Sequence, residues 1–284
     1  MSNSKKFSSV MDTLKLEFLA PDLYMARVDP EEEGRLYGGT IIAKSILAAH
    51  GDLLIDDAFM HSMHGYFLRP GQPDFPIFFE LMLIRKGRSF ATYQITAKQD
   101  GKEIFLLVAS FQVRESGLEF QNDMPKYVGP HDLPALEEFR RNARPKRFLH
   151  SEIDIRPVNK YDLYQNSEIR DSKATFWVKS KLPVKEEPGS HEAFLGFVSD
   201  MYLLDISLMP HGLNHELSNL KVVSLDHSMW FHRSFRTDEW LLIEVESMIT
   251  AGARGFNLGR VYRSDGTLVA SLAQEGLIRV LDET

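Results

Sequence analysis

The chain of 284 residues contains no cysteine. Disulfide bonds, thiolate metal sites and a cysteine nucleophile are therefore excluded. Positive charge is also scarce, because 33 lysines and arginines stand against 40 acidic residues and give a formal net charge of −7. A nucleic-acid-binding surface is disfavoured, since phosphate binding requires a basic face.

Long apolar runs are absent as well. No segment approaches the roughly 20 apolar residues that cross a membrane, so we expect no stable membrane association. Residues 1–11 are polar and lack the apolar stretch of a secretory signal. The last residues, Asp282-Glu283-Thr284, differ from a peroxisomal Ser-Lys-Leu address. A cytoplasmic location is the expectation.

Two catalytic motifs are missing too. The sequence has no Gly-x-Ser-x-Gly, the turn that carries the nucleophile of α/β-hydrolases. It also has no His-Glu-x-x-His, the helical zinc motif of metalloproteases. A serine acyl-enzyme of that type and a metal-bound hydroxide are therefore disfavoured, and no metal or cofactor is expected.

What the sequence does contain is an internal repeat. Three motifs recur at a nearly constant spacing of 165 or 166 residues: His61-Ser62-Met63 with His227-Ser228-Met229, Arg88-Ser89-Phe90 with Arg254-Gly255-Phe256, and Asp100-Gly101 with Asp265-Gly266. Matches at one spacing indicate a duplicated domain. We expect an N-terminal domain over residues 1–115 and a C-terminal domain over residues 172–284. The proline-containing stretch 116–171 is predicted to be a linker with a short helix.

Both halves show the same order of predicted elements. A strand comes first (Leu23 to Val28; Ala174 to Ser180), and an apolar helix follows (Thr40 to Ala49; Glu192 to Leu208). Neither helix has a wide polar face, which is typical of a buried helix. Alternating strands then follow, at Phe78 to Leu83, Ala91 to Lys98 and Ile104 to Val113, and at Leu241 to Ser247, Gly255 to Tyr262 and Leu268 to Val280. The prediction is an α+β fold, a tandem double hot-dog, in which a curved antiparallel sheet wraps a long buried helix in each half.

Several longer motifs resemble those of the acyl-CoA thioesterase II (TesB-like) enzymes, over nearly the whole chain. They are Tyr37-Gly38-Gly39, the run from His61 to Gly71, Gly87 to Phe90, the run from Ser224 to Arg233, Ala253 to Phe256, and Gln274-Glu275-Gly276. The resemblance implies hydrolysis of a fatty acyl-CoA to free fatty acid and CoA. It also implies a homodimer or homotetramer, because the edges of hot-dog sheets often pair between subunits.

The resemblance further implies which residues act. In that family an aspartate on the second helix, a hydroxyl and a glutamine hold the attacking water, and by motif these fall on Asp200, Ser224 and Gln274. Burying a carboxylate in an apolar helix is costly unless the group is bonded, which favours a functional role for Asp200. The first half has Lys44 in its helix, and Ala58 stands where the repeat places Ser224. One site per chain is therefore expected.

Three residues of the first half are candidates for substrate binding. Gly38 and Gly39 precede the first helix, whose unpaired N–H groups favour developing negative charge, although a tight turn explains the glycine pair equally well. His61 either lines the site or is a hydrogen-bonded core histidine. The basic cluster from Arg140 to Arg147 either contacts the phosphates of CoA or forms a solvated helix face.

Two other functions stay open at this point. An acyl-CoA hydratase or dehydratase would need an aspartate and a histidine that converge on the substrate. Asp226 and His227 are adjacent on a predicted strand, so their side chains point to opposite faces. A non-catalytic acyl-CoA-binding protein would share the fold without needing the three water-holding residues.

Overall fold

The computed structural model describes residues 10–28, 34–139, 152–159, 169–214 and 219–281. Contacts within the chain divide it into two compact units. The first comprises Met1–Leu118 with Val184–Val198, and the second comprises Glu119–Pro183 with Ser199–Thr284. The domain and linker boundaries expected from the repeat stay predictions.

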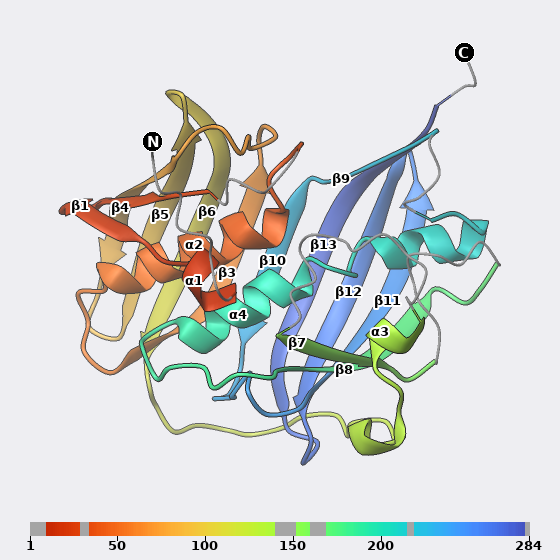
Figure 1. Ribbon diagram of the computed structural model, residues 1–284. Coiled ribbons are helices and arrows are strands. Elements are labelled where there is room, and N and C mark those ends of the chain that lie inside the picture. The colour runs from red at the N-terminus through yellow and green to blue at the C-terminus, as the bar shows by residue number, and fades with distance from the viewer. Residues whose placement is uncertain (1–9, 29–33, 140–151, 160–168, 215–218, 282–284) are drawn as a thin grey trace. The chain divides into compact units, whose positions relative to one another are not determined.

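In the first unit a helix packs against an antiparallel sheet (Figure 1). The helix α2 (Gly38–Gly51) contacts the strands β4, β5 and β6, and the strand order is β1-β2-β4-β5-β6-β3. The strands are β1 (Glu17–Ala20), β2 (Leu23–Ala26), β3 (Ala58–Phe67), β4 (Ile77–Lys86), β5 (Phe90–Gln99) and β6 (Lys102–Val113), and the short helix α1 (Val10–Thr13) precedes them. This is the helix-on-sheet arrangement that the sequence predicts.

The buried position of α2 explains its composition. Ile42 and Ile46 are fully buried, and even Lys44 is only 1% exposed. The Lys44 ammonium donates a hydrogen bond to the backbone carbonyl of Arg27 at 2.9 Å, which helps to offset the cost of burying its charge. A helix buried on most of its surface needs no polar face, as the sequence indicates.

The second unit repeats the sheet. Its strand order is β10-β13-β12-β11-β8-β7, and β9 also pairs with β13. The strands are β7 (Ile153–Pro157), β8 (Lys173–Ser180), β9 (Leu220–Ser224), β10 (Asp226–Phe231), β11 (Leu241–Ala251), β12 (Arg254–Arg263) and β13 (Leu268–Val280), all in antiparallel pairs. Two short helical segments, η1 (Pro130–Asp132) and α3 (Leu136–Phe139), precede β7. The long strand β13 thus pairs with β9 and β10 along one edge and with β12 along the other.

The prediction of one helix from Glu192 to Leu208 is wrong. The helix α4 (Ser190–Ser199) ends earlier, turns follow, and a 3₁₀ helix, η2 (Asp205–His211), then packs against β11 and β12. The helix α4, the turns and η2 are all mostly buried, and a buried segment is mostly apolar whatever its backbone conformation. An apolar run does not distinguish an α-helix from buried turns and a 3₁₀ segment. Asp200 is therefore the first residue after α4 rather than a residue in mid-helix.

The two Asp-Gly turns join the last two strands of each unit, but they differ in length. Asp100 and Gly101 alone connect β5 to β6, with φ of 47° and 68°. Positive φ at both positions is the requirement of a two-residue hairpin turn. Between β12 and β13 the connection runs from Ser264 to Thr267, and Gly266 has φ of 88°.

Gly39 marks a close approach within the first unit. A β-carbon at this position would lie 2.4 Å from the carbonyl oxygen of Phe197 and 2.5 Å from the ring of Tyr37. The Tyr37 hydroxyl donates a hydrogen bond to the same carbonyl at 2.7 Å, and the rings of Tyr37 and Phe197 meet edge to face. Packing of the chain on itself is thus sufficient to require glycine here.

We therefore expect Gly39→Ala to lower the free energy of unfolding by about 1–3 kcal/mol, because the added methyl group overpacks this contact. Denaturant unfolding followed by circular dichroism measures the change. Gly117→Ala is the matched control, since its β-carbon would meet nothing within 4 Å. Equal stability of the two variants would contradict the packing role of Gly39.

Candidate active site

The structure brings Asp200, Ser224 and Gln274 together in the second unit. Gln274 Nε2 donates to Asp200 Oδ1 at 2.6 Å and to Ser224 Oγ at 3.1 Å. Ser224 Oγ in turn donates to Asp200 Oδ1 at 3.3 Å. All three residues predicted from the motifs therefore form one hydrogen-bonded cluster.

The register of the sheet positions two of these residues. Ser224 is the last residue of β9 and lies opposite Gly276 on β13. Gln274 is two residues from Gly276 on the same strand, so its side chain is on the same face. Diagonal neighbours of this kind are within reach of long side chains, which is why the Gln274 amide contacts the Ser224 hydroxyl.

Asp200 needs these donors because of its place in the chain. It follows the last residue of α4, and the negative end of a helix dipole disfavours an anion. Two side-chain donors on Oδ1 offset this effect, and a hydrogen bond to a carboxylate is stronger than one between neutral groups. Asp200 and Ser224 are partly exposed, whereas Gln274 is completely buried.

The orientation of the Gln274 amide follows from its partner. An ionised carboxylate only accepts hydrogen bonds, so the NH₂ group of the amide has to face Asp200. The amide oxygen, Oε1, then points away from the carboxylate. This oxygen is buried and has no hydrogen-bond partner within the described part of the chain.

A second polar pair adjoins the cluster, and sequence analysis missed one of its members. Ser199, directly before Asp200, lies 2.9 Å from Nε2 of His227, which is fully buried. Burial lowers the pKa of His227 to about 3, so its imidazole is neutral at physiological pH. The only signal for Ser199 was a hydroxyl next to the aspartate in an apolar segment.

Asp226 contacts a different group from His227. Its carboxylate accepts a hydrogen bond from the backbone N–H of Glu275 at 2.7 Å, and burial raises the pKa of this carboxyl. The two adjacent residues therefore bond to separate partners, as the alternation of strand faces predicts. They do not form an acid–base pair.

Three of the substrate-binding candidates, Gly38, Gly39 and His61, belong to the first unit. Gly38 and Gly39 are the first two residues of α2. His61 Nε2 lies 2.8 Å from the hydroxyl of Ser110, and its ring meets Phe90 edge to face. His61 is thus hydrogen-bonded within its own unit, and the binding role of these three residues stays a prediction. The predicted cluster from Arg140 to Arg147 lies outside the described residues.

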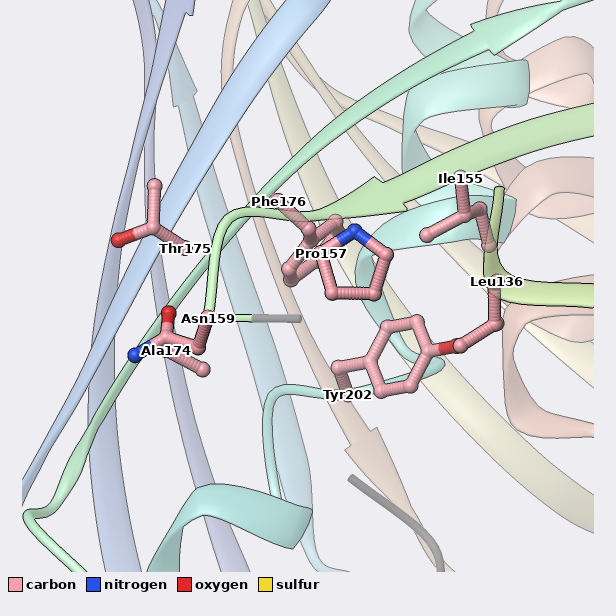
Figure 2. Close-up of a pocket in the computed structure, with 8 residues that line it drawn as sticks. All are labelled: Leu136, Ile155, Pro157, Asn159, Ala174, Thr175, Phe176 and Tyr202. Carbon is pink, nitrogen blue, oxygen red and sulfur yellow. The ribbon is translucent and has the colours of Figure 1, made fainter. Parts of the chain in front are cut away.

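One small cavity of about 10 Å³ lies in the second unit (Figure 2). Leu136 from α3, Ile155 and Pro157 from β7, and Tyr202 from the turns after α4 line it. A volume of this size holds about one water molecule. It is too small for an acyl chain.

No helix in the described residues is long and apolar enough to cross a membrane.

The fold defines a class of protein. A helix against an antiparallel sheet is the arrangement of the double hot-dog fold that the sequence predicts. A structure from Alicyclobacillus acidocaldarius, described as having a hot-dog fold, is similar in fold, with a TM-score of 0.77 at 17% identity over 95% of this chain and 97% of that one. The class is therefore the double hot-dog fold.

Sequence comparison then gives the family. The family described as acyl-CoA thioesterase matches residues 154–277, and the acyl-CoA thioesterase N-terminal domain matches residues 28–112. Human acyl-coenzyme A thioesterase 8 is 36% identical over 95% of this chain and 89% of its own length. The acyl-CoA thioesterase II TesB2 of Mycobacterium marinum is 33% identical over 96% of this chain and 98% of that one, with a TM-score of 0.80. The chain belongs to the acyl-CoA thioesterase II (TesB-like) family and is a thioester hydrolase.

The buried His227 makes the stability of the protein depend on pH. Because its pKa is lowered from 6.5 to about 3 in the folded chain, its stabilising contribution is complete above pH 6.5 and is lost as the pH falls toward 3. His227→Gln removes the titrating group. Between pH 6 and 4 we expect the free energy of unfolding to fall less steeply with decreasing pH in the variant than in the wild type. The two slopes should differ by about 1.4 kcal/mol per pH unit.

Urea unfolding at a series of pH values measures these slopes. His131→Gln, at an exposed position, is the control for the exchange of histidine for glutamine itself. The buried His50 contributes equally to all three proteins and cancels in the comparison. A wild-type slope in His227→Gln would contradict the prediction.

Proposed function

We propose that this enzyme hydrolyses fatty acyl-CoA to a free fatty acid and CoA, by direct attack of a water molecule held by Asp200, Ser224 and Gln274. The observation that carries the proposal is the convergence of a carboxylate, a hydroxyl and an amide on one point, with contacts of 2.6 to 3.3 Å. The relatives named as acyl-CoA thioesterases support acyl-CoA as the substrate class.

In this mechanism Asp200 is the general base. The water oxygen forms a bond to the thioester carbonyl carbon while the carboxylate accepts a proton from the water. The carbon–sulfur bond then breaks, and the CoA sulfur leaves and takes up the proton. A positioned base of this kind contributes about 10²–10⁴-fold to the rate. Ser224 and Gln274 orient the carboxylate and the water.

The surroundings of Ser224 argue against a covalent acyl-enzyme. A serine nucleophile needs an adjacent base that a third group orients. Within the described part of the chain, the hydrogen-bond partners of Ser224 Oγ are Asp200 and Gln274. The neighbouring imidazole, His227, bonds to Ser199 instead.

The same contacts disfavour hydration or dehydration of the acyl chain. Asp226 bonds to a backbone amide and His227 to a buried serine, so they do not converge on a common substrate atom. A non-catalytic binding protein would not require the intact cluster of Asp200, Ser224 and Gln274. The expected cytoplasmic location and homodimeric or homotetrameric assembly stay predictions.

We expect Asp200→Asn to lower kcat by about 10²–10⁴-fold, because it removes the proton acceptor and keeps the shape of the side chain. Binding of acyl-CoA should change little. Ser224→Ala and Gln274→Ala should each cost less, since two of the three groups still hold the water. Release of CoA from palmitoyl-CoA, read with a thiol reagent, gives the rates, and calorimetric titration gives the binding.

Asp226→Asn is the matched control for the Asp200 variant. It makes the same chemical change two residues from Ser224 and retains the oxygen that accepts from the Glu275 N–H. Its kcat should stay close to that of the wild type. Near-wild-type turnover by Asp200→Asn would show that the assignment of the base is wrong.

A further inference from the structure

A row of buried polar side chains leads away from Gln274 across the second unit. Ser247 on β11 lies opposite Asn257 on β12, and Asn257 lies opposite Gln274 on β13. Directly opposed residues share a face of the sheet, so the three side chains are neighbours. The exposed fractions of Asn257 and Gln274 are both 0%.

Ser207, on η2, links two members of this row. Its hydroxyl donates to Asn257 Oδ1 at 2.7 Å, and Ser247 Oγ lies 2.9 Å from Ser207 Oγ. Since the single Ser207 proton is given to Asn257, the Ser247 hydroxyl is the donor in the second contact. The hydrogen bonds therefore all point in one direction, from Ser247 toward Asn257.

Two atoms at the next step of the row lack a hydrogen-bond partner in the described residues. They are Nδ2 of Asn257 and Oε1 of Gln274. One is a donor and the other an acceptor, and burying either of them unpaired is unfavourable. Opposed strand residues have their β-carbons about 5 Å apart, a separation that amide side chains span directly or with one water between them.

The first half shows that the fold does not need this polar pair. The repeat spacing of 166 places Ala91 at the position of Asn257, and Phe111 lies opposite Ala91 as Gln274 lies opposite Asn257. Ala91 and Phe111 are both fully buried. An apolar pair thus fills the same register in the unit that lacks the catalytic cluster.

We propose that Asn257 is a positioning residue for thioester hydrolysis, which rests on the proposed function of Gln274. The Asn257 NH₂ holds Gln274 Oε1 through one shared water, and so keeps the Gln274 NH₂ group on Asp200. If the Gln274 amide rotated, its oxygen would face the carboxylate, and Asp200 would lose the 2.6 Å hydrogen bond from Gln274. The row of donors from Ser247 to Gln274 then ends on the base of the reaction.

A double-mutant cycle tests this role, because a residue that acts through Gln274 has no effect once Gln274 is gone. In the wild-type background Asn257→Ala should lower kcat by about 10- to 100-fold with little change in KM, the cost of a misplaced catalytic group. In the Gln274→Ala background the same substitution should leave kcat unchanged. Ala91 shows that alanine fits this register of the sheet.

A second variant covers the case in which Asn257→Ala does not fold. Asn257→Asp keeps the size of the side chain and the oxygen that accepts from Ser207, but it lacks the NH₂ donor, so kcat should fall here too. Thr96→Val, a change at a buried position of β5 in the first unit, is the control and should keep wild-type kcat. Thermal melts of each variant confirm that the folded fraction is complete at the assay temperature.

Two results would overturn the role of Asn257. One is wild-type kcat in a folded Asn257→Ala or Asn257→Asp variant, when Gln274→Ala alone lowers kcat. The other is an equal loss in both backgrounds, which is the result of a merely structural residue. Wild-type activity of Gln274→Ala alone would instead overturn the water-holding cluster itself, and the role of Asn257 with it.

Discussion

The carboxylate of Asp200 is the group on which the polar structure of the second unit depends. It lies at the carboxyl end of α4, where the helix dipole opposes a negative charge, and an ionised group there requires donors. Gln274 and Ser224 supply them from two strands that the register of β13 brings together. The length of β13 matters because one strand has to pair with β9, β10 and β12 to hold both donors in place.

The two repeated units differ in the polarity of the same pair of sheet positions. The two units share a strand plan, yet the register that carries Asn257 and Gln274 in one unit carries Ala91 and Phe111 in the other. A fully buried polar pair is less favourable than an apolar pair unless every group is satisfied. Its presence in the unit with the carboxylate is consistent with polar groups being kept where the reaction uses them.

Much of the fold was predictable because strands that bury one face alternate with a period of two. The bounds of β13 and the hairpin between β5 and β6 follow from this alternation and from the turn dipeptide. The end of the helix α4 was not predictable, because buried turns and a 3₁₀ segment have the same apolar composition as an α-helix. The break after Ser199 depends on tertiary packing, which periodicity does not report.

The site was predictable in part. Asp200, Ser224 and Gln274 follow from motifs that resemble a family, whereas the physical chemistry of the sequence singled out only the carboxylate. Asn257 and Ser207 gave no signal, because a lone amide on a strand or a serine in an apolar segment is ordinary. Their connection to the cluster appears only when the register places Asn257 opposite Gln274.

The central claim is that water attacks the thioester directly. A single turnover of acyl-CoA by excess enzyme in isotopically labelled water, with mass spectrometry of both the fatty acid and the quenched protein, tests it most directly. The account predicts one labelled oxygen in the acid from the first turnover and a protein of unchanged mass. An acyl group on Ser224, or an unlabelled acid with the label in the Asp200 carboxylate, would contradict it.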